Sequence, residues 1–169
     1  TGGISAQNAA SARLYGLELS ADLRVTDKFT LTGGGLLGHG RFPRYQSAAI
    51  YCPIAFSSPG YAGCPAPTGG PGLASGTADL SGSPIPRAPE VSFSLGAEYR
   101  RPITENWTAT LWANDRYTSE YDLLPGAGGP LQLSRQRAYH LVSLGLSLAD
   151  DKSGLEGRLF VNNLTKSRY

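Results

Sequence analysis

The sequence predicts an all-β protein, an antiparallel up-and-down meander of about six long strands. Three observations predict it. Apolar and polar residues alternate in six separate segments of the 169-residue chain, and alternation divides side chains between the two faces of a strand. Charged residues make up only 17% of the chain and glycine occurs 22 times, a balance that suits strands better than helices. No apolar run reaches the roughly 18 residues of a membrane-spanning helix.

The first three expected strands alternate clearly. Leu14–Val25 has apolar residues at every odd position and charged or small residues between them. Phe29–Phe42 carries a phenylalanine and leucines on one face and threonines on the other. Val91–Arg100 separates valine, phenylalanine, leucine, alanine and tyrosine from serine, glycine and charged residues. Each therefore has one apolar and one polar face.

The other three expected strands follow the same rule. Trp107–Thr118 is less regular, because Trp112 joins the polar face and Asp115 interrupts the apolar face. Tyr139–Ala149 sets valine and leucines against serines and glycine. Leu155–Leu164 sets apolar residues against glutamate, arginine and asparagine.

Short and long connections alternate between these strands. The short ones are Thr26–Lys28, Arg101–Asn106 and Asp150–Gly154, and the long ones are Arg41–Glu90 and Ser119–Ala138. In an up-and-down meander this order puts all short turns at one end of the sheet and all long loops at the other.

Strand length and aromatic placement indicate a membrane. The segments are about twice as long as ordinary strands of five or six residues, and a membrane-crossing strand needs about 9–11. On the apolar face, Tyr15 and Tyr117 lie toward the long-loop end, and Phe29, Tyr99 and Trp107 toward the short-turn end. Aromatic residues at both ends of an apolar band are typical of interfacial girdles.

A soluble β-sandwich is the alternative, since its strands also alternate. In a membrane, six strands with two open edges would leave backbone groups unsatisfied in hydrocarbon. A membrane-embedded sheet must therefore be one segment of a larger barrel.

Four stretches resemble one family in their order along the chain. NAASARLYGLELSADL (8–23), PRAPEVSFSLGAEYRRP (86–102), WTATLWANDRYTSEYD (107–122) and RLFVNNLTKSRY (158–169) are similar to barrel segments of TonB-dependent outer-membrane receptors. They cover nearly all of the chain except the loop tips.

The resemblance implies that residues 1–169 are part of a plugged 22-stranded barrel in the bacterial outer membrane, with the plug domain and the final strand absent. Residues 41–90 would form a long extracellular loop. The expected partners are outer-membrane lipid, the rest of the barrel, the plug domain, the TonB energy-coupling protein through the missing N-terminal part, and a small-molecule ligand. The whole receptor would bind and import a scarce solute with energy from the inner membrane.

Cys52 and Cys64 are the only cysteines and both lie in the expected extracellular loop. An oxidising surface favours a disulfide between them. A metal site is disfavoured, because no Cys-x-x-Cys spacing and no nearby histidine occur. Free thiols remain the alternative.

Charged residues on the polar face are expected to neutralise each other across strands. Residues near the long-loop end are instead candidates for substrate contact, because arginine and tyrosine suit anionic or catecholate-type ligands. These candidates are Arg41, Arg44, Tyr45, Arg116, Tyr121 and Asp122. A ferric siderophore is the leading ligand, with cobalamin and carbohydrate as alternatives.

Other functions are less well supported. A passive porin or channel, and a soluble adhesin-type sandwich, are the alternatives to the receptor. An enzyme is not expected, because no catalytic set is visible, and neither a cofactor nor a metal site is expected. Scattered lysines and arginines give no nucleic-acid stripe.

Overall fold

The computed structural model describes residues 11–53, 73–124 and 134–169. Ten strands are present in these ranges: β1 (Ser11–Thr26), β2 (Phe29–Arg44), β3 (Ala48–Pro53), β4 (Leu73–Ala78), β5 (Val91–Pro102), β6 (Trp107–Thr118), β7 (Tyr121–Asp122), β8 (Arg135–Gln136), β9 (Tyr139–Asp150) and β10 (Glu156–Val161). No helix long and apolar enough to cross a membrane occurs among the described residues.

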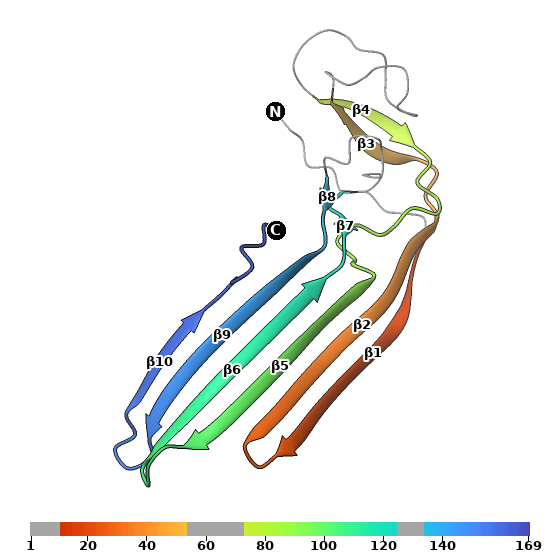
Figure 1. Ribbon diagram of the computed structural model, residues 1–169. Helices are drawn as coiled ribbons and strands as arrows, with labels where there is room; N and C mark the ends of the chain where they lie inside the picture. The colour runs from red at the N-terminus through yellow and green to blue at the C-terminus, as the bar shows by residue number, and fades with distance from the viewer. Residues whose placement is uncertain (1–10, 54–72, 125–133) are drawn as a thin grey trace. The chain divides into compact units, whose positions relative to one another are not determined.

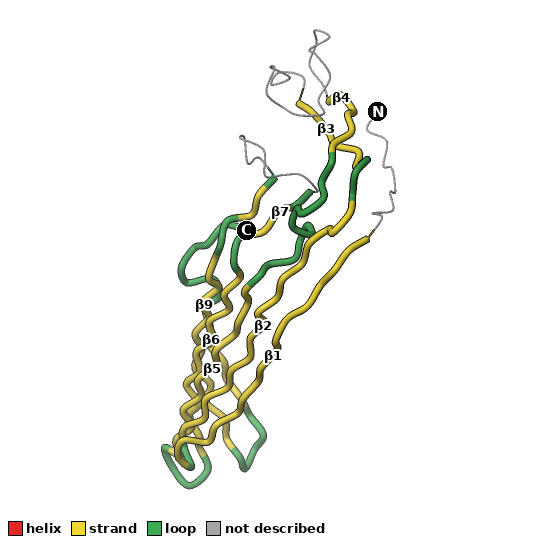
Figure 2. Tube along the Cα trace, turned by 90° about the vertical axis from the view of Figure 1, so that its right-hand side faces the viewer, coloured by secondary structure: helices red, strands yellow, loops and turns green. Residues whose placement is uncertain are grey.

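Six of these strands form one antiparallel sheet in the order β1-β2-β5-β6-β9-β10. The order follows the chain, so the predicted six-strand meander is confirmed (Figure 1). Seen from the side, the six strands form a single layer (Figure 2). The long β1 and β2 extend two or more residues beyond the predicted segments at their loop ends.

The chain divides into two compact units. The sheet unit comprises Gly16–Gly38, Pro89–Glu120 and Arg137–Tyr169. The loop unit comprises Thr1–Tyr15, His39–Ala88 and Tyr121–Gln136. It contains two short hairpins, β3–β4 and β7–β8, which the sequence did not predict. Their strands are only two to six residues long, so they lack the long alternation that identified the other six.

Short turns join the sheet strands at one end, as predicted (Figure 1). The β5–β6 turn is closed by the Trp107 N–H, which donates to Thr104 Oγ1 at 3.1 Å. In the β9–β10 turn, Asp150 accepts from the Ser153 hydroxyl at 2.6 Å, and Gly154 adopts a φ of 73° that glycine tolerates best. The Asp151 N–H also donates to the Asn106 carbonyl at 2.8 Å, which joins the two turns.

The last strand is shorter than predicted, and the expected end at Leu164 is wrong. β10 ends at Val161, because Asn163 and Lys166 have φ values of 52° and 53°. A left-handed backbone cannot continue a regular strand. The Asn163 side chain stabilises this bend: its Oδ1 accepts from the Ser167 N–H at 2.9 Å, and its Nδ2 donates to the Ser167 carbonyl at 3.0 Å.

Candidate functional site

Strand pairing assigns the large apolar side chains of the sheet to one face. Directly opposed residues of antiparallel strands share a face, and one such row is Tyr99, Leu111, Leu146 and Leu159. On β1, the Ser20 side chain lies next to Gly34 on the polar face of the sheet. Successive residues of a strand point to opposite faces, so the odd-numbered residues of β1 lie on the apolar face. The apolar face therefore includes Leu17, Leu19, Leu95, Leu111, Leu144 and Val161, in agreement with the alternation of their segments.

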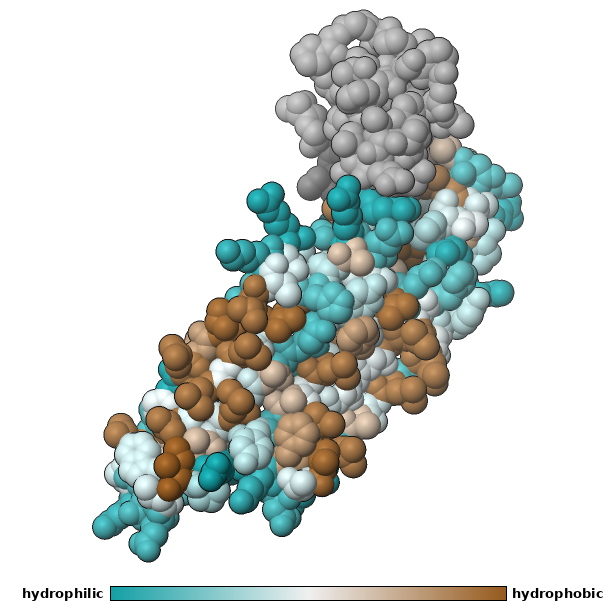
Figure 3. Space-filling model, in the orientation of Figure 1, coloured by the Kyte–Doolittle hydropathy of each residue, from teal (hydrophilic) through white to brown (hydrophobic). Residues whose placement is uncertain are grey.

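The apolar face is uncovered. Leu95 and Leu111 are each 55% exposed, and Leu159 is 75% exposed. Apolar side chains gather across the middle of the sheet in Figure 3. A soluble sandwich would bury these leucines against a second sheet, so their exposure contradicts that alternative. A contiguous exposed apolar surface of this kind indicates contact with lipid.

Aromatic side chains border this face at both ends. Phe29 lies opposite Tyr99 near the short-turn end, where Trp107 begins β6. Near the long-loop end Phe93 stacks on Tyr117, with ring centroids 5.0 Å apart. Ten residues separate Trp107 from Tyr117, about 33 Å along a strand. At the usual tilt this distance corresponds to an apolar band about 25 Å tall, the height seen in outer-membrane barrels.

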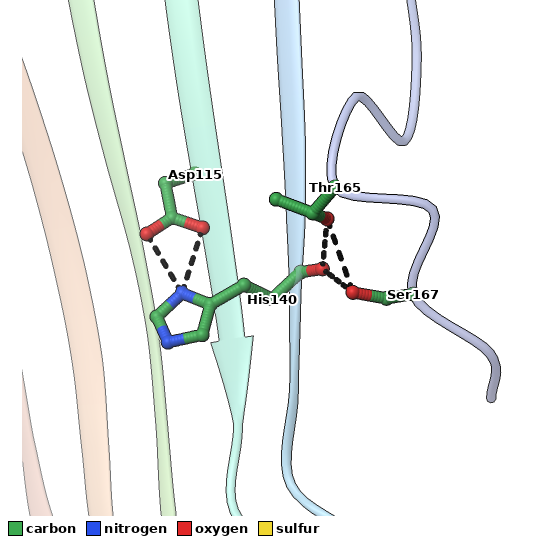
Figure 4. A network of polar contacts seen from close by, with 4 residues as sticks. All are labelled: Asp115, His140, Thr165 and Ser167. Atoms are coloured by element: carbon green, nitrogen blue, oxygen red, sulfur yellow. Dashed lines mark hydrogen bonds and ion pairs between the residues drawn. The ribbon is translucent and has the colours of Figure 1, made fainter.

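One hydrogen-bonded pair, Asp115 and His140, interrupts the apolar face near its long-loop border. His140 Nδ1 lies 2.9 Å from an Asp115 carboxylate oxygen (Figure 4). The ring centroids of His140 and Tyr117 are 4.7 Å apart. The His140 carbonyl accepts hydroxyl hydrogen bonds from Thr165 at 3.0 Å and Ser167 at 2.6 Å. The network thus joins β6, β9 and the segment after β10.

Sequence reasoning noted that Asp115 interrupts the apolar pattern but did not find its partner. The sequence did contain a signal: His140 lies two residues before Val142 in the same strand and therefore shares its apolar face. Pairing two polar residues on the apolar faces of two expected strands would have suggested this contact.

The opposite face of the sheet is polar, and glycines keep it close-packed. A Cβ on Gly145 would collide with the indole of Trp112, and a Cβ on Gly96 would collide with Thr32 Oγ1. Each glycine therefore leaves room for a side chain of the neighbouring strand to lie along the sheet.

Arg116 lies on this polar face toward the long-loop end of β6. It stands opposite Ser94 on β5 and Leu141 on β9, and its side chain is exposed. It belongs to the sheet unit, whereas the other five predicted substrate-contact residues belong to the loop unit.

Tyr45 is a core residue of the loop unit. It is 8% exposed and packs with Phe42, Ala48 and Leu80. Its N–H donates to Ser81 Oγ at 2.9 Å, and its carbonyl accepts from the Leu80 N–H at 2.8 Å. These contacts give Tyr45 a structural role in the base of the long loop.

Asp122 is likewise buried, at 5% exposure. Its carboxylate pairs with Arg135 Nε at 3.0 Å, and its carbonyl accepts from the Arg87 N–H at 2.7 Å. Asp122 therefore ties the two long connections together. Arg135 and Arg87, which were not among the predicted residues, complete this arrangement.

The remaining predicted contacts, Arg41, Arg44 and Tyr121, lie nearer the surface. Arg41 is half-buried and forms an isolated bridge with Pro84, and its Nη1 donates to the Gly40 carbonyl at 3.1 Å. Arg44 ends β2 with an exposed side chain, and Tyr121 begins β7 with a half-buried one.

In one turn of the loop unit, hydrogen bonds stabilise the charged form of an aspartate. A hydrogen bond from the Ser81 side chain, with a second from its N–H, lowers the pKa of Asp79 below its ordinary value. Asp79 thus stays ionised to lower pH than a free aspartate.

The predicted Cys52–Cys64 disulfide stays a prediction, because Cys64 lies outside the described residues.

Comparison with known proteins identifies the family. The chain matches the family model described as TonB dependent receptor-like, β-barrel, over residues 1–164. No curated protein and no solved structure matches it significantly. The uncovered apolar band and the meander agree with a barrel wall. The chain therefore belongs to the TonB dependent receptor-like β-barrel family and forms part of a barrel in the bacterial outer membrane.

Proposed function

We propose that this chain is part of a receptor that captures an anionic solute at the cell surface and imports it with energy relayed from the inner membrane. Its family is one of outer-membrane transport receptors rather than enzymes. A ferric siderophore is the leading solute, and TonB, reached through a part of the receptor outside this chain, is the proposed source of energy.

The charge of the loop unit is the observation that supports an anionic ligand. This unit contains five arginines and two aspartates, with no lysine or glutamate, which gives a formal charge of +3. One of the aspartates, Asp122, is already paired with Arg135. The arginine guanidinium group binds carboxylates and catecholate-like oxygens through bidentate hydrogen bonds. Net positive charge also raises the local concentration of anions.

The experiment measures uptake by the full-length receptor in cells that lack their own copy. Cells receive ⁵⁵Fe bound to an anionic tricatecholate, with and without a protonophore. We expect uptake that needs the receptor and stops when the protonophore is added. Saturable binding without energy should persist.

Two outcomes would replace this proposal, and a third would narrow the set of contact residues. Uptake that persists with the protonophore would indicate a passive channel. Competition by cobalamin or by an oligosaccharide, with none by the ferric complex, would assign one of those solutes instead. Substitution of Arg44 by glutamine should weaken surface binding several-fold, and an unchanged affinity would remove Arg44 from the candidate contacts.

A further inference from the structure

The polar face of the sheet carries an arginine in neutral surroundings. Its neighbours on the same face are Ser94 and Leu141 across the strands, and Asn114 and Thr118 along β6. Since the apolar face meets lipid, this polar face lines the inside of the barrel wall. Arg116 is thus directed inward, while its chain neighbours Asp115 and Tyr117 are directed outward.

No carboxylate in the described part of the chain ion-pairs with Arg116. Glu98, on the same face, stands opposite Trp112, about 13 Å nearer the short-turn end along β6. Glu156 is held by Arg158, with contacts of 2.6 and 2.8 Å. Glu90 and Glu120 lie beyond the ends of β5 and β6, and both have other interactions. The mutual neutralisation expected for polar-face charges therefore does not extend to Arg116.

On the short-turn side of Arg116, the polar face carries hydroxyls and amides. Asn114 lies opposite Gly96 and Ser143, and Gly96 lies opposite Thr32. Because Gly96 lacks a side chain, the Thr32 hydroxyl and the Asn114 amide both reach its position, the amide Nδ2 to within 3.6 Å of where a Cβ would lie. This wall offers neutral hydrogen-bonding groups on the short-turn side of one positive charge.

We infer that Arg116, with Ser92, Ser94, Asn114, Thr118 and Ser143, forms an inner-wall anion site that the imported solute contacts after it leaves the surface loops. This inference rests on the proposed function and assigns it a step inside the barrel. A single guanidinium beside neutral hydroxyls attracts an anion yet releases it again, as a transport pathway requires.

The test places a thiol beside Arg116 in the full-length receptor. Ser94→Cys puts a sulfur on the strand directly opposite, with Cβ atoms about 5 Å apart. The rate at which this cysteine is modified is measured in intact cells with an anionic and with a cationic methanethiosulfonate reagent. The receptor without this cysteine serves as the blank. We expect the anionic reagent to react faster, and Arg116→Gln to lower the anionic-to-cationic rate ratio about five- to tenfold.

Two variants separate charge from structure. Arg116→Lys keeps the charge and should preserve the rate ratio, but it should slow the uptake of the ferric tricatecholate, because an ammonium lacks the planar fork. Arg100→Gln removes a charge from the same face about 20 Å away, beyond the screening length, and should leave the ratio unchanged.

The outcomes distinguish the site from the receptor function. An unchanged ratio in Arg116→Gln overturns the inference, and so does a cysteine that neither reagent reaches with or without energy. Loss of folded receptor in both Arg116→Gln and Arg116→Lys would assign Arg116 a structural role and would also overturn the inference. If the ratio responds but no ferric complex is imported, the anion site stands and the siderophore proposal fails.

Discussion

Gly145 shows how one missing side chain shapes the inner wall. A Cβ at this position would overlap the indole of Trp112, whose Nε1 would lie only 2.6 Å away. Because the ring is rigid and flanked by its own strand, Gly145→Ala must rotate it away from the sheet. We expect a destabilisation of about 1–3 kcal/mol, typical of overpacking. A lower temperature for the heat-induced gel shift of the full-length receptor would measure it.

Gly157 provides the matched control for this substitution. It lies in the neighbouring strand β10, and nothing lies within 4 Å of its Cβ position. Gly157→Ala should be neutral or slightly stabilising, because alanine reduces the freedom of the unfolded chain. Equal transition temperatures for the two variants would show that Trp112 accommodates the added methyl group.

The Asp115–His140 pair is a second prediction at the residue scale. His140→Ala leaves an unpartnered carboxylate on the lipid-facing surface, whereas Asp115→Asn with His140→Ala removes the charge as well. We expect the double variant to be more stable than His140→Ala alone, with a coupling of about 1 kcal/mol. Urea unfolding of the receptor in lipid vesicles supplies the four free energies, and additive effects would contradict the prediction.

The bend after β10 is a feature of the element scale. Asn163 combines a left-handed backbone with two hydrogen bonds to Ser167. Asn163→Gly keeps access to this backbone and loses the hydrogen bonds, whereas Asn163→Ala loses both. Alanine should therefore be worse than glycine by about 1 kcal/mol.

Hydrogen exchange of the Leu164 amide, which donates to the Val142 carbonyl at 2.9 Å, reports on this bend. Lys166→Gly is the control: its φ of 53° favours glycine, so protection should be kept or increased. Faster exchange in the glycine variant of Asn163 than in the alanine variant would show that the backbone conformation contributes nothing.

The bend after β10 also explains why the alternation of Leu155–Leu164 predicted a strand that was too long. Side-chain hydroxyls of Thr165 and Ser167 replace backbone donors at the His140 carbonyl. Hydrophobic periodicity reports which face a residue occupies, but it cannot detect a side chain that substitutes for a ladder hydrogen bond.

At the scale of the whole molecule, the sheet requires a lipid or detergent environment. Its apolar face is uncovered on all six strands, and β1 and β10 are its two edges. Residues 1–169 produced alone should therefore sediment as aggregates in aqueous buffer. Analytical ultracentrifugation with and without detergent checks this, and a monodisperse monomer in plain buffer would contradict the lipid-facing assignment.

The sequence alone determined the six-strand meander, the division into an apolar and a polar face, and the end at which the short turns lie. These follow from a period of two, which needs no knowledge of distant contacts. The tertiary structure alone decided which residues meet: the burial of Tyr45 and Asp122, the Asp115–His140 pair, and the neutral surroundings of Arg116. Such contacts depend on strand register and on loop packing, and both join residues that lie far apart in the chain.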